Sequence, residues 1–333
     1  MNVKGKNVFA GLSGGVDSAV SAALLREAGA QVTGVFIKGW YPPGMPCTWT
    51  EDRRDAMRTA ARLQIPFRTL DASAEYKSGV IDYLLSEYRA GRTPNPDVMC
   101  NREVKFGAFY RYAKAAGADA IAMGHYRSGE KDQSYFLWAV PKDILEKTIF
   151  PVGDFEKDTV RALAHTFKLP VAEKRDSQGV CFLGSISIEE FLRAEFGEAP
   201  GEAIDQSGRM VGTHNGVLLH TLGERVALVG ATEPGPWFVH AKNISLNQLM
   251  VGKERISGGI RTKKEILIVH ENWFARPKGA IEAQYRYRGP HIRGEIRNNV
   301  FVSSDELPEI PAPGQSMVFY HSGNLIGGGI IAA

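Results

Sequence analysis

The segment Ser13-Gly14-Gly15-Val16-Asp17-Ser18 carries the clearest chemical signal in the chain. It follows a short apolar strand, Val8-Phe9-Ala10, and precedes apolar residues at helical spacing. Two glycines let the backbone approach a ligand, and the free N–H groups of a helix N-terminus attract anions. Asp17 could hold a Mg²⁺ that neutralises phosphates. The loop predicts a phosphate or pyrophosphate site, with a capped glycine-rich turn as the alternative.

Two familiar nucleotide loops do not fit this segment. No lysine follows to complete G-x-x-x-x-G-K-[ST], and G-x-G-x-x-G is absent, which disfavours a dinucleotide oxidoreductase. The S-G-G-x-D-S pattern after a first strand resembles the pyrophosphatase-loop enzymes. Members of that family cleave ATP between the α and β phosphates and adenylate an acceptor, and they include several synthetases and tRNA-modifying enzymes. The loop alone does not choose among them.

A second candidate lies in the polar stretch of residues 91–106, where Asp97 and Cys100 are three positions apart. The stretch precedes a helical run that Asn101 could cap. A thiol near a helix N-terminus and basic residues becomes a competent nucleophile. Because Asn101 and Arg102 flank Cys100, a reactive role is favoured over that of a small core residue.

The other two cysteines are less informative. Cys181 lies in a glycine-bearing polar loop, residues 176–184, but the following Phe182 and Leu183 also fit a core position. Cys47 lies in a loop with no evident partner, so we leave it structural or idle. The three cysteines have no zinc-ligand spacing and cannot close a disulfide framework.

The elements that must position these residues alternate between strands and helices in the first half of the chain. Strand-like runs at 32–37, 66–70 and 120–123 alternate with helical runs at about 51–64, 73–89 and 101–116. This pattern predicts an open parallel sheet with helices on both faces. Ligands of such sheets lie beyond the carboxyl ends of the strands. The loops at 11–18, 38–50, 71–72 and 124–131 should therefore face one site.

The texture changes after about residue 200. Short apolar runs at 216–220, 237–239, 265–269 and 316–320 are separated by Gly, Pro and Asn clusters. They predict one or two small β domains, built as barrels. We expect domains at 1–199, 200–259 and 260–333.

Composition restricts the class of protein. The chain has 333 residues and a net charge of +3, with no signal-peptide-like start and no run of about 18 apolar residues. These features predict a cytoplasmic protein that does not span a membrane. The charge is uneven, because residues 261–297 hold nine Lys/Arg and four Glu, a net +5. Within them Tyr285-Arg286-Tyr287-Arg288 interleaves aromatic and guanidinium groups, as stacking on unpaired RNA bases requires; a solvated strand face is the alternative.

Together these motifs resemble the tRNA-specific 2-thiouridylases of the bacterial MnmA type over nearly the whole chain. The resemblance is carried, in order, by residues 11–18, 34–40, 91–106, 124–126, 131–137, 150–153, 176–184, 220–223, 285–288, 313–315 and 327–329. It implies an adenine-nucleotide alpha-hydrolase-like parallel sheet with helices on both faces, followed by two small β domains that grip tRNA.

The resemblance also implies roles for the residues of the N-terminal domain. The ATP phosphates would be held by Gly11, Leu12, Ser13, Gly14, Gly15, Val16, Asp17 and Ser18, with Mg²⁺ on Asp17. Ile37 and Gly124 would pack near the adenosine. Asn95, Pro96 and Asp97 would meet the target uridine, with Asp97 as an acid or base. Cys100 would be the nucleophile and Cys181 the persulfide carrier.

The tRNA contacts implied by the resemblance are spread along the chain. They are His125, Lys131, Asp132, Gln133, Arg286, Tyr287 and Gln315. Each has a plainer structural alternative. Residues 131–133 could be a helix start, His125 a buried loop histidine, and residues 327–329 a β-bulge.

The implied reaction explains why these residue types occur together. The oxygen on carbon 2 of uridine is a poor leaving group, so it must first be adenylated by ATP. Sulfur would then come from a persulfide on Cys181, and Cys100 would attack that persulfide or complete the transfer, leaving a Cys100–Cys181 disulfide to be reduced. The uridine would be extruded from the anticodon stack to reach the pocket.

The sequence departs from its relatives in two places. Only residues 127–130 separate Tyr126 from Lys131, where relatives usually carry a longer insertion. In the central domain, Glu224 and Val226 stand where relatives typically show Gln and Lys. The change in charge there would weaken or redirect the grip of the central domain on RNA.

Two other functions stay open at this point. One is a pyrophosphatase-loop enzyme that adenylates another acceptor, and the other is a non-catalytic tRNA-binding protein. The sequence does not identify the tRNAs or the persulfide donor, which would be a cysteine desulfurase or a sulfur-relay protein, and it leaves open whether the chain is monomeric.

Overall fold

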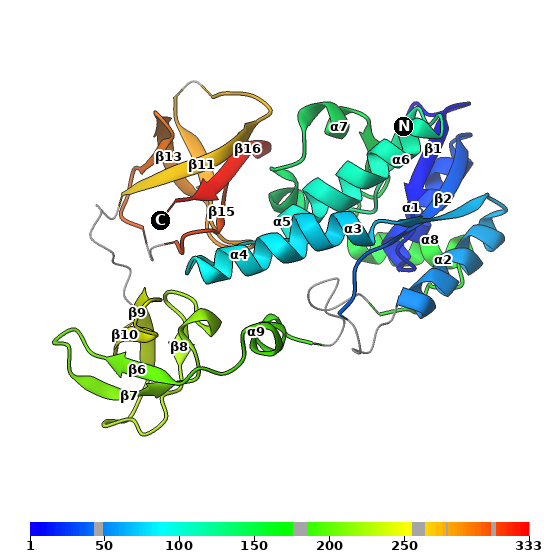
Figure 1. Ribbon diagram of the computed structural model, residues 1–333. Helices are drawn as coiled ribbons and strands as arrows, with labels where there is room; N and C mark the ends of the chain where they lie inside the picture. Colours follow the sequence, from blue (N-terminus) through cyan, green and yellow to red (C-terminus); the bar gives the residue numbers. More distant parts are fainter. Residues whose placement is uncertain (43–48, 176–185, 255–263, 278, 308–310, 333) are drawn as a thin grey trace. The chain divides into compact units, whose positions relative to one another are not determined.

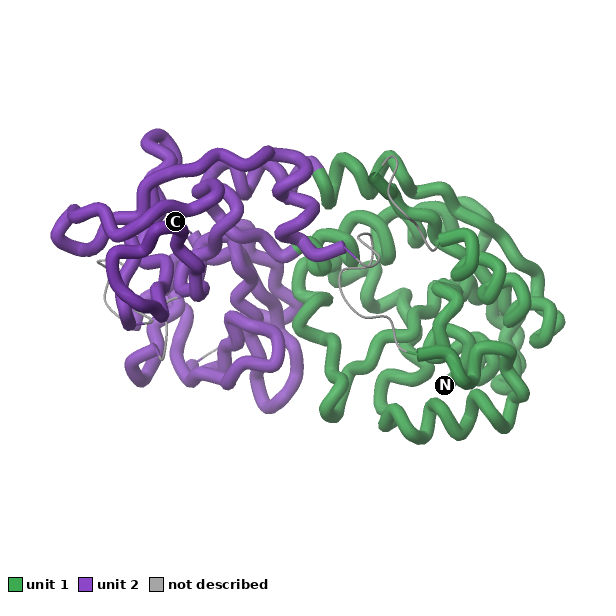
Figure 2. Tube along the Cα trace, turned by 90° about the horizontal axis from the view of Figure 1, so that it is seen from below, with its two compact units in different colours: residues 1–81, 96–185 green, residues 82–95, 186–333 purple. Residues whose placement is uncertain are grey.

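The computed structural model describes residues 1–42, 49–175, 186–254, 264–277, 279–307 and 311–332. The chain divides into two compact units (Figure 2). Unit 1 comprises residues 1–81 and 96–185, and unit 2 comprises residues 82–95 and 186–333. The chain therefore crosses between the units three times, and the short segment 82–95 belongs with the C-terminal half.

Unit 1 is built on a five-stranded sheet with the order β3-β2-β1-β4-β5. Figure 1 labels two of its neighbouring strands, β1 and β2. The strands are β1 (Asn7–Gly11), β2 (Gln31–Lys38), β3 (Phe67–Asp71), β4 (Ala120–Ala122) and β5 (Thr148–Ile149). All four pairings are parallel, with Val8 opposite both Val32 and Ala120. The predicted parallel sheet is confirmed.

Helices cover both faces of this sheet. The side chains of β1 alternate between the two faces, so successive residues of this strand contact different helices. Val8 and Ala10 belong to one core cluster with buried residues of α1 (Val16–Glu27), α2 (Trp49–Leu63) and α8 (Lys157–Thr166). On the other face, Phe9 contacts Tyr112 of α6 (Phe109–Ala115).

Two π-helical segments interrupt the remaining helices. The first run is α3 (Ser73–Tyr76), π-helix η1 (Lys77–Asp82) and α4 (Tyr83–Arg89); the second is α5 (Pro96–Met99), π-helix η2 (Cys100–Ala108) and α6. A Cβ on Gly79 would lie 2.6 Å from Cγ of Glu103, so the two π-helical segments pack closely at this glycine. π-helical turns are rare and frequently occur at functional sites. The short η3 (Ser134–Leu137) and α7 (Lys142–Glu146) complete the helices described in unit 1.

Unit 2 contains two β domains, as predicted. Helix α9 (Ile188–Phe196) precedes a sheet of order β7-β6-β10-β9-β8. Its strands are β6 (Gly201–Ile204), β7 (Met210–His214), β8 (Arg225–Val226), β9 (Trp237–Asn243) and β10 (Gln248–Gly252). Residues 216–220 were predicted as part of a strand run, but the structure has the 3₁₀-helix η4 (Val217–Leu219) there. The side chains of His214 and Asn247 accept from the backbone N–H groups of Gly216 and Val217, which bends the chain out of a strand.

The C-terminal domain is a closed barrel of order β11-β14-β13-β12-β15-β16. Its strands are β11 (Glu265–Trp273), β12 (Ile281–Gln284), β13 (Ile292–Arg297), β14 (Val300–Ser303), β15 (Ser316–His321) and β16 (Asn324–Ile331). Trp273 stacks on Phe319 with ring centroids 5.1 Å apart, and a Cβ on Gly327 would lie 2.9 Å from the indole. The glycine therefore makes room for this aromatic pair. In the described parts of both units, no helix is long and apolar enough to cross a membrane.

Candidate active site

The predicted phosphate loop lies at the carboxyl end of β1 and opens helix α1. Gly14 has φ +80°, and a Cβ there would lie 2.3 Å from the backbone oxygen of Asp52, so only glycine fits. Helix α1 has no side-chain cap at Gly15. Its first N–H groups therefore point to the loop without a capping side chain, as an anion site requires.

Two serine hydroxyls shape the loop from inside. The Oγ atoms of Ser13 and Ser18 are 3.1 Å apart, and the Ser18 hydroxyl donates to the carbonyl oxygen of Gly15 at 3.0 Å. The backbone N–H of Gly15 donates to Ser13 Oγ at 3.3 Å. These hydrogen bonds between residues of the loop define its conformation.

Asp17, the predicted magnesium ligand, accepts two strong hydrogen bonds. The Tyr126 hydroxyl and the Lys157 ammonium group each donate to its Oδ1 at 2.6 Å. Lys157 is the first residue of α8, and its side chain is 12% exposed. Sequence reasoning missed Lys157, because 140 residues separate it from Asp17 and no local motif links them.

The end of β4 packs against the same loop. A Cβ on Gly124 would lie 2.9 Å from the backbone nitrogen of Ser18 and 3.0 Å from the carbonyl carbon of Asp17. Gly124 thus lies against the first turn of α1, which agrees with the expected loop cluster. Ile37 is partly buried near the end of the neighbouring β2. Adenosine contacts by these two residues stay predictions.

Asp97 and Cys100 occupy the short α5 and the first position of η2. The Cys100 side chain is buried, with 2% exposed, although polar residues flank it in sequence. Burial raises the pKa of the Asp97 carboxyl above its ordinary value, and the positive charge of Lys105 partly opposes this shift. A buried acid with a raised pKa suits proton transfer near neutral pH. Lys105 is a second residue that the sequence did not single out.

His125 is buried in an aromatic cluster next to these residues. Its ring lies 5.4 Å from that of Phe106 and 6.2 Å from that of Phe150. Asn101 Nδ2 donates to the carbonyl of Phe136, which turns Asn101 Oδ1 toward His125 Nε2 at 3.2 Å. Burial, together with the charge of Lys105, lowers the pKa of His125 to about 3. The imidazole is therefore neutral at physiological pH and, in this structure, is not on an exposed surface.

Residues 131–133 make local bonds in unit 1. Asp132 Oδ1 accepts from the backbone N–H of Ser134 at 2.7 Å, at the start of η3. Gln133 Oε1 accepts from the backbone N–H of Tyr126 at 3.1 Å. These bonds give two of the residues a structural role, whereas a contact of Lys131, Asp132 or Gln133 with tRNA stays a prediction.

The predicted RNA residues of unit 2 differ in exposure. Tyr285 is buried in the barrel core, Arg286 is exposed and Tyr287 is partly buried, with Arg288 5.2 Å from its ring. Gln315 instead donates its side-chain amide to the backbone carbonyl of Thr93 at 2.8 Å. Contacts of Arg286, Tyr287 and Gln315 with tRNA are not tested by the geometry.

The central domain contains a charged cluster around one of the sequence departures. Glu224 Oε1 lies 2.6 Å from His220 Nδ1, and Lys242 Nζ donates to the His220 carbonyl at 2.8 Å. Burial lowers the pKa of Lys242 to about 8, against the favourable charge of Glu224. The Glu224 carboxylate is thus engaged within the domain.

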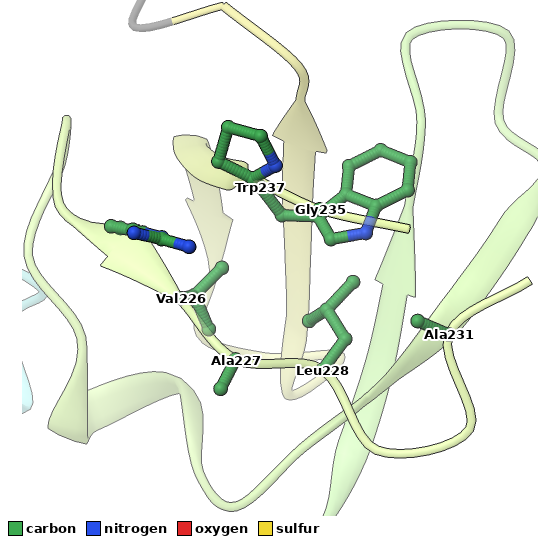
Figure 3. A pocket seen from close by; sticks show the side chains of 8 residues that line it. Val226, Ala227, Leu228, Ala231, Gly235 and Trp237 are labelled. Carbon is green, nitrogen blue, oxygen red and sulfur yellow. The ribbon is translucent and has the colours of Figure 1, made fainter. Parts of the chain in front are cut away.

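A pocket of about 440 Å³ opens on the same domain (Figure 3). Its lining includes Arg225, Val226, Leu228 and Trp237. Trp237 is only 5% exposed, and Lys253 Nζ lies 3.7 Å from its ring centroid. Too little of the indole is exposed to stack a nucleobase, so we assign the pocket no ligand.

Cys181, the predicted persulfide carrier, and Cys47 lie outside the described residues. Among the residues that the structure does describe, no group of three or more His, Cys, Asp or Glu side chains could hold a metal ion. Because Mg²⁺ usually keeps several water ligands, a Mg²⁺ on Asp17 would be held by this carboxylate together with water and phosphate oxygens.

Comparisons with known proteins cover all three regions of the chain. Family models match at residues 6–130 and 127–185 (tRNA methyl transferase HUP domain), 189–253 (tRNA methyl transferase PRC-barrel domain) and 263–331 (aminomethyltransferase beta-barrel domain). Among solved structures, the U34-tRNA thiolase NcsA from Methanococcus maripaludis is 20% identical, with a TM-score of 0.38, over 59% of this chain and 69% of that chain.

Two curated relatives illustrate the similarity in sequence. The tRNA-specific 2-thiouridylase MnmA of Akkermansia muciniphila is 39% identical, covering 97% of this chain and 97% of the relative. The protein of that name from Pseudomonas savastanoi is 38% identical, covering 99% and 95%. Because each relative shares this identity with the chain over nearly the full length of both proteins, the chain belongs to the tRNA-specific 2-thiouridylase MnmA family.

Proposed function

We propose that this chain is an ATP-dependent transferase that converts the wobble uridine of tRNA to 2-thiouridine. The observation that carries the proposal is the 39% identity, over 97% of the chain, to a protein named tRNA-specific 2-thiouridylase. The loop at Gly14 supports it, since its geometry suits a phosphate group. The partners would be tRNA and a persulfide donor, either a cysteine desulfurase or a sulfur-relay protein.

The loop residues 11–18 would bind the phosphates of ATP during activation. The uncapped N–H groups of α1 would contact them, and Lys157 would hold Asp17 in place beside them. Mg²⁺, when bound through Asp17, would neutralise the charge that develops on the departing pyrophosphate. The 2-oxygen of the uracil attacks the α phosphorus, and the bond to the bridging oxygen of pyrophosphate breaks. The oxygen of the base thereby becomes part of a good leaving group, AMP.

Sulfur transfer would then use the two cysteines. The thiolate of Cys100 attacks the inner sulfur of the Cys181 persulfide, which forms a disulfide between the two cysteines and releases hydrosulfide. The hydrosulfide attacks carbon 2, AMP leaves, and a proton is lost from sulfur to give the thiocarbonyl. An external thiol reductant supplies two electrons to reopen the disulfide.

Asp97 would serve as the acid or base at the uridine. Its raised pKa keeps a larger protonated fraction near neutral pH than an exposed aspartate has. It lies three residues from Cys100 on consecutive helical segments, so the same movement would bring both to the base. Because Cys100 is 2% exposed, the reaction requires a movement that uncovers this thiol.

The central experiment measures 2-thiouridine in tRNA by mass spectrometry after incubation with ATP and a persulfide donor. Cys100→Ser and Cys181→Ser should each abolish the product while tRNA binding stays within twofold of wild type. Cys47→Ser is the matched control and should retain activity. Full activity of either of the first two variants would refute this mechanism.

Pyrophosphate release separates the activation step from the alternatives. It should depend on tRNA and persist in Cys100→Ser, because adenylation precedes sulfur transfer. Release without any tRNA would favour an enzyme that adenylates another acceptor. Tight tRNA binding with neither pyrophosphate release nor thiolation would favour a non-catalytic binding protein.

A further inference from the structure

The segment 82–95 is a short piece of the N-terminal half that belongs to unit 2. It comprises helix α4 and the loop that follows it. Arg92 fastens this loop to α4, because its guanidinium group donates to both carboxylate oxygens of Glu87 at 2.6 and 2.5 Å. Arg89 lies 5.3 Å from the ring of Phe196 in α9. The segment is therefore held as part of unit 2.

Thr93 joins this loop to both β domains. Its backbone N–H donates to the carbonyl of Pro313 at 2.8 Å, and its own carbonyl accepts from the Gln315 side chain at 2.8 Å. Both partners lie just before β15 in the C-terminal barrel. On the other side, Thr93 Oγ1 donates to Oγ1 of Thr221 in the central domain at 3.3 Å. One residue thus contacts two separate β domains.

Two glycines permit these close approaches. Gly314 has φ +91°, and a Cβ there would lie 3.0 Å from the backbone nitrogen of Thr93. Gly91 has φ +77°, and a Cβ there would lie 3.2 Å from Cδ1 of Ile244. Larger residues at either position would be strained and would push the loop away from its domain.

The loop continues directly into the candidate catalytic residues. The chain passes from unit 2 to unit 1 between Asn95 and Pro96, and Pro96 begins α5. Asp97 follows at once, and Cys100 begins η2 four residues after Pro96. Any displacement of Thr93 is therefore transmitted to the start of this helical run through the two residues between it and Pro96.

We propose that Thr93 and Gln315 are positioning residues, which couple the β domains to the placement and exposure of Cys100. This inference deepens the proposed function, on which it rests. This role of Gln315 differs from the tRNA contact expected from sequence. Its side-chain amide holds the backbone at Thr93, three residues before Pro96 and four before Asp97. The β domains would thus control whether the buried thiol is uncovered.

The size of the effect follows from the bond that is removed. Alkylation of a buried thiol proceeds through rare openings, so its rate follows the population of the open form. Gln315→Met keeps the length of the side chain and removes the donor to Thr93. One neutral hydrogen bond shifts such an equilibrium about three- to tenfold.

The experiment measures the rate at which iodoacetamide alkylates Cys100 in the full chain, followed by mass spectrometry of its peptide. We expect Gln315→Met to alkylate about three- to tenfold faster than wild type, while the rate at Cys47 is unchanged. In thiolation assays kcat should fall, because the released segment no longer holds Cys100 in place for the reaction, whereas KM for tRNA should stay within twofold of wild type. Gln248→Met is the matched control, because the Gln248 amide donates to Glu202 elsewhere in unit 2, and it should match wild type.

A second variant protects the test against a folding defect. Gly314→Ala should accelerate Cys100 alkylation in the same direction, because its Cβ would displace Thr93. Unchanged alkylation in both variants, or a rise in KM for tRNA with unchanged Cys100 reactivity, would overturn the proposal. Alkylation requires neither ATP nor tRNA, so it tests the coupling independently of thiolation. If the variants accelerate Cys100 alkylation but the wild-type protein does not thiolate tRNA, the proposed function is refuted and the coupling stands.

Discussion

Acidification should destabilise unit 1 through His125, and the size of the effect can be worked out. The pKa of this imidazole is about 3 in the folded chain, against an ordinary value of 6.5. Between these values the unfolded chain binds a proton that the folded chain does not, so stability falls as pH decreases from 6.5 toward 3. At about 1.36 kcal/mol per pH unit, lowering the pH from 7.5 to 5.0 costs about 2 kcal/mol.

The assay compares wild type with His125→Gln, which retains an amide donor for Asn101. Urea unfolding at both pH values is followed by pulse proteolysis, with peptides of unit 1 read by mass spectrometry. The loss of unfolding free energy between pH 7.5 and 5.0 should be about 2 kcal/mol smaller in the variant. The cost of the substitution itself cancels in this difference. If the losses in wild type and variant differ by less than about 0.5 kcal/mol, His125 is not held neutral by its surroundings. This threshold is about a third of the 1.36 kcal/mol that corresponds to one pKa unit.

Three further predictions concern the loop and the central domain. Gly14→Ala should weaken ATP binding at least tenfold in calorimetry, because φ +80° and a contact at 2.3 Å exclude a Cβ. Gly15→Ala is the control: its Cβ would have its nearest contact at 3.3 Å, so it should bind ATP within about threefold of wild type. Lys157→Met should weaken ATP binding about tenfold by leaving Asp17 uncompensated beside the phosphates, and Lys157→Arg should recover most of it; equal affinities would contradict this role. The pKa of Lys242 is about 8 in the folded chain, below its ordinary 10.5. The free energy of unfolding of unit 2 in urea should therefore be about 1 kcal/mol higher at pH 9 than at pH 7, and Lys242→Met should lose this increase in stability.

Local patterns predicted the architecture well where one residue type decides the outcome. The apolar run at Val8–Ala10 and the glycines after it specified a buried strand and a loop that only glycine can form. The run at 216–220 failed as a strand prediction, because side chains from His214 and Asn247 capture its backbone N–H groups. Local apolar content does not report such contacts.

The candidate site was predictable only where its residues are close in sequence. Lys157 meets Asp17 across 140 residues, so no local motif links them. Lys105 lies within the polar stretch 91–106, but its effect on Asp97 and His125 acts through charge, which the residue types alone do not reveal. The polar neighbours of Cys100 favoured a reactive thiol over a small core residue, yet Cys100 is buried at the start of η2. Exposure depends on how the helix packs, and that information is not contained in the flanking residue types.

The placement of segment 82–95 has a consequence for how the chain is made. Thr93 leaves the ribosome before its partner Gln315, which lies 222 residues further along the chain. At roughly 5–20 residues per second, the segment waits on the order of ten to forty seconds for the barrel that will hold it. Unit 1 can therefore assemble its sheet during synthesis, whereas this loop reaches its final contacts only after the last strands emerge. The order of synthesis thus makes the segment that leads into Asp97 and Cys100 one of the last parts of the chain to be fixed in place.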